Sequence, residues 1–188
     1  MSNGTFDFNL FLKESKETLL NPKSYFSTMK IAGGITEPII KAAIYGTIAG
    51  IIYLLWDLLR IGAAGGGLMG GAVGFTAFFM AIIFAVIGAF IGAVILLIIS
   101  SICKGNTDFE ANLRVTASLM VVMPISALFS FTMGINLYLG LIIDLVIKLY
   151  ALWLLYNGLV EALKGKPETA KIVSYVLIAL MVLYILVV

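Results

Sequence analysis

Long apolar runs with almost no charge are the feature that most constrains the fold of this chain. Runs of about 20 apolar residues recur along its 188 residues, of which 62% are hydrophobic and 12% are charged. Because a helix rises about 1.5 Å per residue, such a run matches the roughly 30 Å hydrocarbon core of a bilayer. The runs show no period-2 alternation, which argues against a transmembrane β-barrel. The sequence therefore predicts an all-α integral membrane protein.

Five runs are long enough to cross the membrane, and we expect a bundle of five transmembrane helices. They lie at about residues 39–59, 74–101, 115–133, 137–163 and 172–188. Residues 1–38 precede them as a separate amphipathic segment, in which phenylalanine and leucine are interspersed with lysine and glutamate. This composition predicts a short helix on the membrane surface. Asn21-Pro22 predicts the start of a second short helix, which Gly33-Gly34 is expected to end.

The distribution of basic residues predicts the orientation of the bundle. In the five-span arrangement, Arg60 alone falls on one side of the membrane, and Lys148 lies within it. The other basic residues all fall on the opposite side: Lys13, Lys16, Lys23, Lys30, Lys41, Lys104, Arg114, Lys164, Lys166 and Lys171. By the positive-inside rule, the N-terminus is expected in the cytoplasm and the C-terminus outside.

Asp144 and Lys148 are charged residues inside the fourth apolar run. Their i, i+4 spacing places them on one face of a helix, where they can pair. Because an ionisable group at bilayer depth is costly, we expect this face to turn toward the interior of the bundle. Two roles are open: a structural ion pair, or a proton or ion relay. If Asp144 instead pairs with another helix, Arg114, Asn112 and Asn157 are the candidate partners.

The ends of the first span carry two further candidate polar residues. Glu37 precedes Pro38, which fits the first turn of a helix, and a glutamate suits the positive end of the helix dipole. Asp57 and Arg60 lie at the other end beside Trp56, where we expect them to pair at the membrane surface. The glycine-rich stretch that follows, residues 62–74, lacks the GKS or GKT of a phosphate-binding loop and is expected to be a connection.

Small residues predict where the helices pack closely. Gly46 and Gly50 form a small-xxx-small pair in the first span. The second span carries a row of small residues that predicts the centre of the bundle: Ala77, Ala81, Ala85, Gly88, Ala89, Gly92 and Ala93. In the third span, Pro124 removes the donor for the carbonyl of Met120, so we expect a kink there.

The chain shows no signature of an enzyme or of a cofactor site. It has no histidine and a single cysteine, Cys103, so neither an ordinary zinc or haem site nor an intramolecular disulfide is expected. The motifs GxSxG and HExxH are absent, as are paired intramembrane aspartates. We therefore expect a protein that is not an enzyme and binds no cofactor and no nucleic acid.

Four stretches, in this order and spacing, resemble the Yip1 domain. They are residues 21–26 (NPKSYF), 37–38 (EP), 105–114 (GNTDFEANLR) and 150–159 (YALWLLYNGL). The resemblance covers nearly the whole chain and implies a five-span membrane domain with a cytoplasmic N-terminus. Eukaryotic members act in vesicle traffic and contact Rab-type small GTPases through longer N-terminal regions. The short N-terminal segment of this chain is more similar to compact bacterial or archaeal members, so it implies a prokaryotic plasma membrane and does not favour GTPase binding.

Two functional hypotheses follow. The first is a non-enzymatic membrane organiser or scaffold that interacts with lipids, with a partner membrane protein or with further copies of itself. The alternative is a small ion or solute transporter or channel that uses the Asp144–Lys148 pair.

Overall fold

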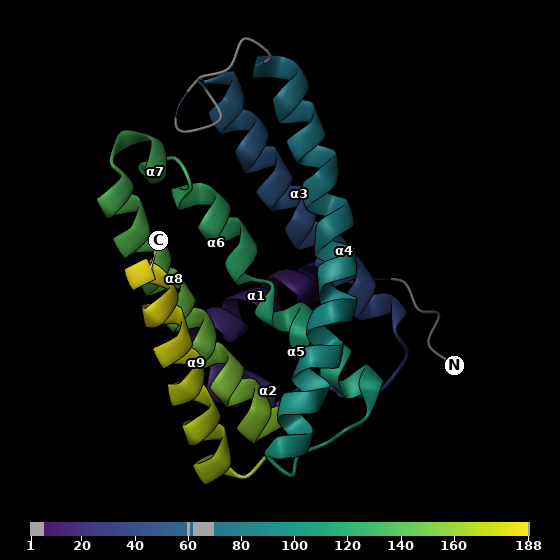
Figure 1. Cartoon of the computed structure of the whole chain (residues 1–188). Coiled ribbons are helices and arrows are strands. Elements are labelled where there is room, and N and C mark those ends of the chain that lie inside the picture. Colours follow the sequence, from purple (N-terminus) through teal and green to yellow (C-terminus); the bar gives the residue numbers. More distant parts are fainter. Residues whose placement is uncertain (1–5, 60, 62–69, 188) are drawn as a thin grey trace.

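The computed structural model describes residues 6–59, 61 and 70–187, without the side chains of residues 70–74, 77 and 184–187. Every regular element in this part of the chain is a helix, which confirms the all-α class (Figure 1). In chain order the elements are α1 (Phe8–Leu20), α2 (Pro22–Thr28), α3 (Thr36–Leu58), α4 (Gly70–Ile102), α5 (Phe109–Leu119), α6 (Val122–Phe129), α7 (Thr132–Ile135), α8 (Leu137–Asn157), the π-helical turn η2 (Gly158–Ala162) and α9 (Pro167–Val187).

Four segments of the described chain are long and apolar enough to cross a membrane. They are Thr36–Leu58, Phe78–Ile102, Phe109–Ile135 and Leu137–Ala162. The protein is therefore a multi-pass membrane protein. Helix α9 packs against α8 and runs back along it (Figure 1). Its side chains are described only as far as Leu183, so the fifth crossing stays a prediction.

Helices α3 and α4 form a close antiparallel pair because the residues between them are small. A Cβ atom added at Gly46 would lie 2.6 Å from the Cβ of Ala85, and one at Gly50 would lie 2.9 Å from the carbonyl oxygen of Phe78. Both distances are well below ordinary van der Waals separation. The predicted small-residue row of α4 is buried at three positions, each at most 1% exposed: Ala85, Ala89 and Ala93.

Other members of that row behave differently. Ala81 is half-buried, and its carbonyl oxygen lies against Gly46. A Cβ at Gly92 would lie 2.8 Å from a methyl group of Thr116, so this glycine admits α5 rather than α3. A Cβ at Gly88 would have no neighbour within 4 Å, so the expected packing role of Gly88 is wrong. Ala77 lies outside the described side chains.

The third span is interrupted where Pro124 predicts a kink. Helix α5 ends at Leu119 and α6 begins at Val122, and the carbonyl of Met120 accepts a hydrogen bond from the amide of Met123 at 2.9 Å instead of a regular helical bond. Proline has no N–H to supply that bond. A second interruption separates α6 from α7.

The third span begins earlier than expected. Asp108 caps α5, since its side chain accepts a hydrogen bond from the amide of Ala111 at 2.9 Å. The polar stretch up to residue 114, expected to be a loop, is therefore helical from Phe109 onward. This helix carries Glu110, Asn112 and Arg114 to the bundle.

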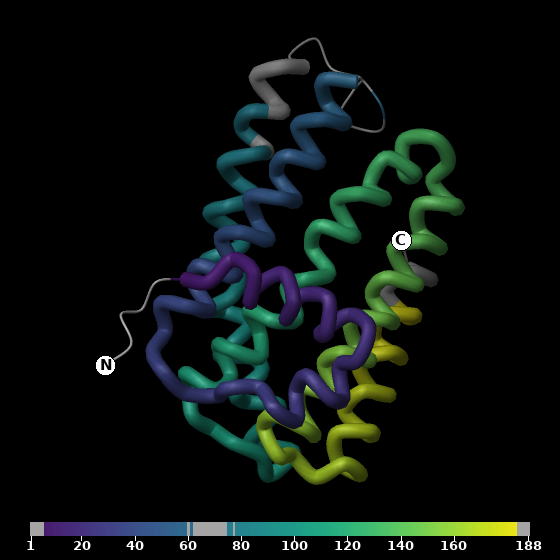
Figure 2. The backbone as a smooth tube through the Cα atoms, turned by 180° about the vertical axis from the view of Figure 1, so that it is seen from behind, coloured from purple at the N-terminus to yellow at the C-terminus, as the bar shows by residue number. Residues whose placement is uncertain are grey.

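The N-terminal helices pack on the bundle as a layer. Figure 2 shows α1 crossing the face between the α3–α4 pair and α8. Phe11 is 2% exposed and packs on Tyr45 with ring centroids 5.1 Å apart. Helix α2 starts at Pro22 as predicted but ends at Thr28. Gly33 and Gly34 do not end it; with φ of +134° and +97° they form the turn that leads into α3.

Candidate functional site

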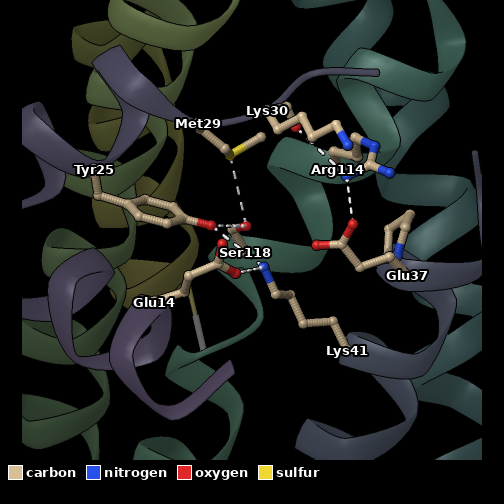
Figure 3. Close-up of a pocket in the computed structure, with 9 residues that line it drawn as sticks. Glu14, Tyr25, Met29, Lys30, Glu37, Lys41, Arg114 and Ser118 are labelled. Atoms are coloured by element: carbon tan, nitrogen blue, oxygen red, sulfur yellow. Dashed lines mark hydrogen bonds and ion pairs between the residues drawn. The ribbon is translucent and has the colours of Figure 1, made fainter. Parts of the chain in front are cut away.

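A buried polar cluster lies where α1, α2, α3 and α5 meet (Figure 3). The helices surround a small cavity of about 20 Å³, the volume of roughly one water molecule. Its lining combines three cations with two carboxylates: Glu14, Tyr25, Met29, Lys30, Glu37, Pro38, Lys41, Arg114 and Ser118.

Arg114 is the centre of one half of the cluster. Its side chain is 5% exposed, with Nη1 2.8 Å from Oε2 of Glu37 and Nε 3.2 Å from Oε1 of Glu110. Nη2 donates to the carbonyl of Gly34 at 2.9 Å, and the amide of Gly34 donates to Oε1 of Glu110 at 2.6 Å. A planar guanidinium can donate in several fixed directions at once. Arg114 thereby joins α5, the first turn of α3 and the glycine turn before it.

Lys41 is the centre of the other half. Its Nζ lies 2.6 Å from Oε2 of Glu14 and 3.3 Å from the hydroxyl of Tyr25, and the side chain is 7% exposed. That hydroxyl shares a hydrogen bond with Oγ of Ser118 at 2.9 Å. An ammonium group buried without a partner is very costly. The position of Glu14, and with it the position of α1, is therefore tied to Lys41.

Further polar contacts attach α1 to the bundle beside this cluster. Oγ of Ser15 and the hydroxyl of Tyr45 share a hydrogen bond at 2.7 Å. The hydroxyl of Tyr150, on α8, donates to the carbonyl of Leu19 at the end of α1. Helix α1 thus bridges α3 and α8, which are far apart in the sequence.

The Asp144–Lys148 pair is formed, but it does not face inward. Nζ of Lys148 lies 2.6 Å from Oδ2 of Asp144, while the two side chains are 48% and 27% exposed. The expected inward orientation is wrong. The buried residues of α8 are Gly140, Leu154 and Asn157. The two charges bond to each other within one helix, so the pair forms without a residue from another helix.

Asp57 is buried rather than placed at the surface. It is 4% exposed, and neither carboxylate oxygen has a hydrogen-bond partner in the described part of the chain. Its expected partner, Arg60, lies outside the described residues. The neighbouring Trp56 donates from Nε1 to the carbonyl of Ala127 at 3.0 Å and packs against Phe131.

Asn112 and Asn157 are buried, and both bond locally. Nδ2 of Asn112 donates to the carbonyls of Asn106 at 3.0 Å and Asp108 at 2.7 Å, which closes the loop that leads into α5. Nδ2 of Asn157 donates to the carbonyl of Trp153 at 2.8 Å. Neither amide bonds to Asp144.

The described residues show neither a metal-binding cluster nor an exposed cysteine. No set of three or more His, Cys, Asp or Glu side chains gathers in that part of the chain. Cys103 is fully buried, and burial raises the pKa of its thiol, which lowers the fraction of reactive thiolate at neutral pH. The polar cluster can hold helices together. A larger pocket of about 600 Å³ adjoins it and shares six of its lining residues: Glu14, Tyr25, Met29, Lys30, Glu37 and Lys41.

Sequence reasoning did not single out Glu14, Tyr25 and Lys41 as site residues. The available signal was Lys41, a charge one turn inside an apolar span. Its i, i+4 neighbour Glu37 would have suggested the wrong partner, because Glu37 pairs with Arg114 and Lys41 with Glu14. These pairings cross between helices, and only the fold brings them together.

The family model of the Yip1 domain matches residues 16–188. No curated protein and no solved structure matches the chain. The matched region includes α2, the spans and every charged residue of the polar cluster except Glu14. The match over nearly the whole chain agrees with the membrane-spanning helices described above. The chain belongs to the Yip1 domain family, a family of non-enzymatic membrane proteins.

Proposed function

We propose that this protein is a membrane organiser, a scaffold that binds lipids or partner proteins and carries no substrate across the bilayer. The observation that carries the proposal is that the buried cations are paired with carboxylates. Arg114 and Lys41 are bonded to carboxylates of other elements, around a cavity with room for about one water. Such a cluster fixes helices in place.

The outer face of α1 supports contact with the membrane surface. Phe8, Leu12 and Leu20 are 55%, 50% and 65% exposed, although Phe11 on the same helix is buried in the bundle. An amphipathic helix with exposed apolar side chains and adjacent lysines binds at the boundary between headgroups and acyl chains. We infer that α1 lies in this boundary on the cytoplasmic side.

The proposed orientation places the N-terminus in the cytoplasm and the C-terminus outside, in a prokaryotic plasma membrane. The basic residues support the orientation, because the positive-inside rule assigns the lysine-rich side to the cytoplasm.

The alternative function is a small ion or solute transporter or channel. Asp57 favours it, because a buried carboxylate without a partner among the described residues is typical of intramembrane functional sites. The interruption between α5 and α6 is a second feature of transporter helices. The outward position of Asp144 and Lys148 weighs against a pathway through the bundle that uses this pair.

A flux assay separates the two functions. The purified protein would be reconstituted in vesicles, and proton, potassium and sodium flux would be followed under a gradient and a membrane potential. If the protein is a scaffold, the flux rates should equal those of protein-free vesicles. Flux above that background, lost in Asp57→Asn and retained in Asp144→Asn, would establish the alternative and contradict the scaffold.

A further inference from the structure

The Asp144–Lys148 pair lies at a depth where lipid alone cannot satisfy it. Lys148 lies 11 residues after Leu137, the first residue of α8. At about 1.5 Å per residue this is roughly 16 Å along the helix, near the middle of a 30 Å hydrocarbon core. Lys148 is nonetheless 48% exposed. The α8–α9 pair forms one edge of the molecule in Figures 1 and 2.

The pair leaves hydrogen-bonding groups unused. An ammonium group has three N–H donors and a carboxylate has several acceptor sites, and one contact of 2.6 Å uses only part of them. Neither side chain has another hydrogen-bond partner among the described residues. Hydrocarbon offers neither donors nor acceptors, so satisfying these groups requires a polar partner at the same depth.

A second copy of the chain supplies such a partner. We propose that this face of α8 is a homodimer interface, in which Asp144 and Lys148 of each copy pair with Lys148 and Asp144 of the other. In a dimer with its two-fold axis along the membrane normal, contacts are reciprocal, so a face that carries both charges complements itself. The four-residue spacing is about 6 Å along the helix, a distance that a lysine side chain can reach. The four charges sum to zero.

The inference rests on the proposed function, because it names the partner that the scaffold leaves open. Its test is association between copies, which is measured without reference to flux. A flux-competent protein that dimerises as described would contradict the proposed function and leave the dimer intact. A protein that shows no flux and stays monomeric would contradict the dimer and leave the proposed function intact.

Charge-reversal variants test the pairing directly. Asp144→Lys gives each copy two positive charges on this face, and Lys148→Asp gives each copy two negative charges. Full-length donor- and acceptor-labelled proteins would be mixed in phosphatidylcholine vesicles and followed by energy transfer. Each single variant alone is expected to lose transfer to the level of random encounter, and an equal mixture of the two is expected to recover it. The double variant Asp144→Lys with Lys148→Asp, which restores the pair within the helix, is expected to associate as wild type.

Cysteine cross-linking keeps the test independent of how well the charge variants fold. In a Cys103→Ser background, Leu141→Cys lies two turns from Lys148 on the same face, whereas Val146 lies on the opposite side of α8 and is 59% exposed. Disulfide-linked dimers are expected for Leu141→Cys and not for Val146→Cys. Three results would overturn the proposal. They are energy transfer in wild type no higher than random encounter gives, equal cross-linking at both positions, and energy transfer in the mixture no higher than in its separate variants.

Discussion

Gly46→Ala tests the claim that α3 and α4 are held together by close backbone approach. The added methyl group would lie 2.6 Å from the Cβ of Ala85 and 2.8 Å from the carbonyl oxygen of Ala81. Ordinary carbon contacts are about 3.5–4.0 Å, so the overlap is roughly 1 Å. A backbone oxygen cannot rotate away as a side chain can, so the two helices must separate. Overpacking of this kind costs about 1–3 kcal/mol.

Gly88→Ala is the matched control. It makes the same substitution in the neighbouring helix, at a position where a Cβ meets nothing within 4 Å. Both changes gain about 1 kcal/mol of helix propensity, so the difference between the two variants reports the packing cost alone. At about 2–4 °C per kcal/mol, Gly46→Ala should melt roughly 2–12 °C below Gly88→Ala.

The assay is thermal unfolding of the purified proteins in one detergent, followed by far-ultraviolet circular dichroism. Equal melting temperatures for the two variants would refute the packing of α3 on α4. A lower melting temperature for Gly88→Ala than for Gly46→Ala would mean that the other face of α4 is the packed one.

The remaining predictions concern the polar cluster and the cysteine. Glu14→Gln leaves the Lys41 ammonium without its carboxylate and should lower stability by about 1–3 kcal/mol, while the double variant with Lys41→Met should recover part of the loss in the same melting assay. Without recovery, the two residues would not be partners. Arg114→Lys should melt below wild type, because one ammonium cannot reach partners in three directions; an unchanged melting temperature would contradict the geometry of Arg114. Cys103 should react with maleimide at neutral pH many times more slowly in the native protein than in the detergent-unfolded one, because it is buried and its pKa is raised. Equal rates would show that Cys103 is accessible.

The fold class and several helix boundaries were predictable from sequence because they depend on local chemistry. The lengths of the apolar runs predict the spans, and Pro22 predicts the start of α2. Pro124 predicts the interruption of the third span about one turn earlier in the chain, because proline lacks the N–H donor of the regular helical bond. The Asp144–Lys148 pair was also predictable, since i, i+4 spacing is a property of one helix.

The orientation of that pair and the membership of the polar cluster could not be predicted in the same way. In a membrane protein both the interior and the lipid-facing surface are apolar, so a helix such as α8 carries little amphipathic signal to show which face turns inward. Glu14, Lys41 and Arg114 come from three helices, and the pairs Glu14–Lys41 and Glu37–Arg114 join residues that are far apart in the sequence. Only helix packing brings these segments together.

We infer that the buried charges dock the N-terminal layer on the bundle. Hydrogen exchange of the full-length protein in lipid nanodiscs tests this docking, because it reports the protection of each segment. We expect the amides of α1 to be protected in wild type, Lys41→Met to remove this protection, and Lys148→Met, which alters an exposed charge of α8, to leave it unchanged. Free exchange of α1 in wild type, or equal protection in wild type and Lys41→Met, would show that these charges do not dock the layer.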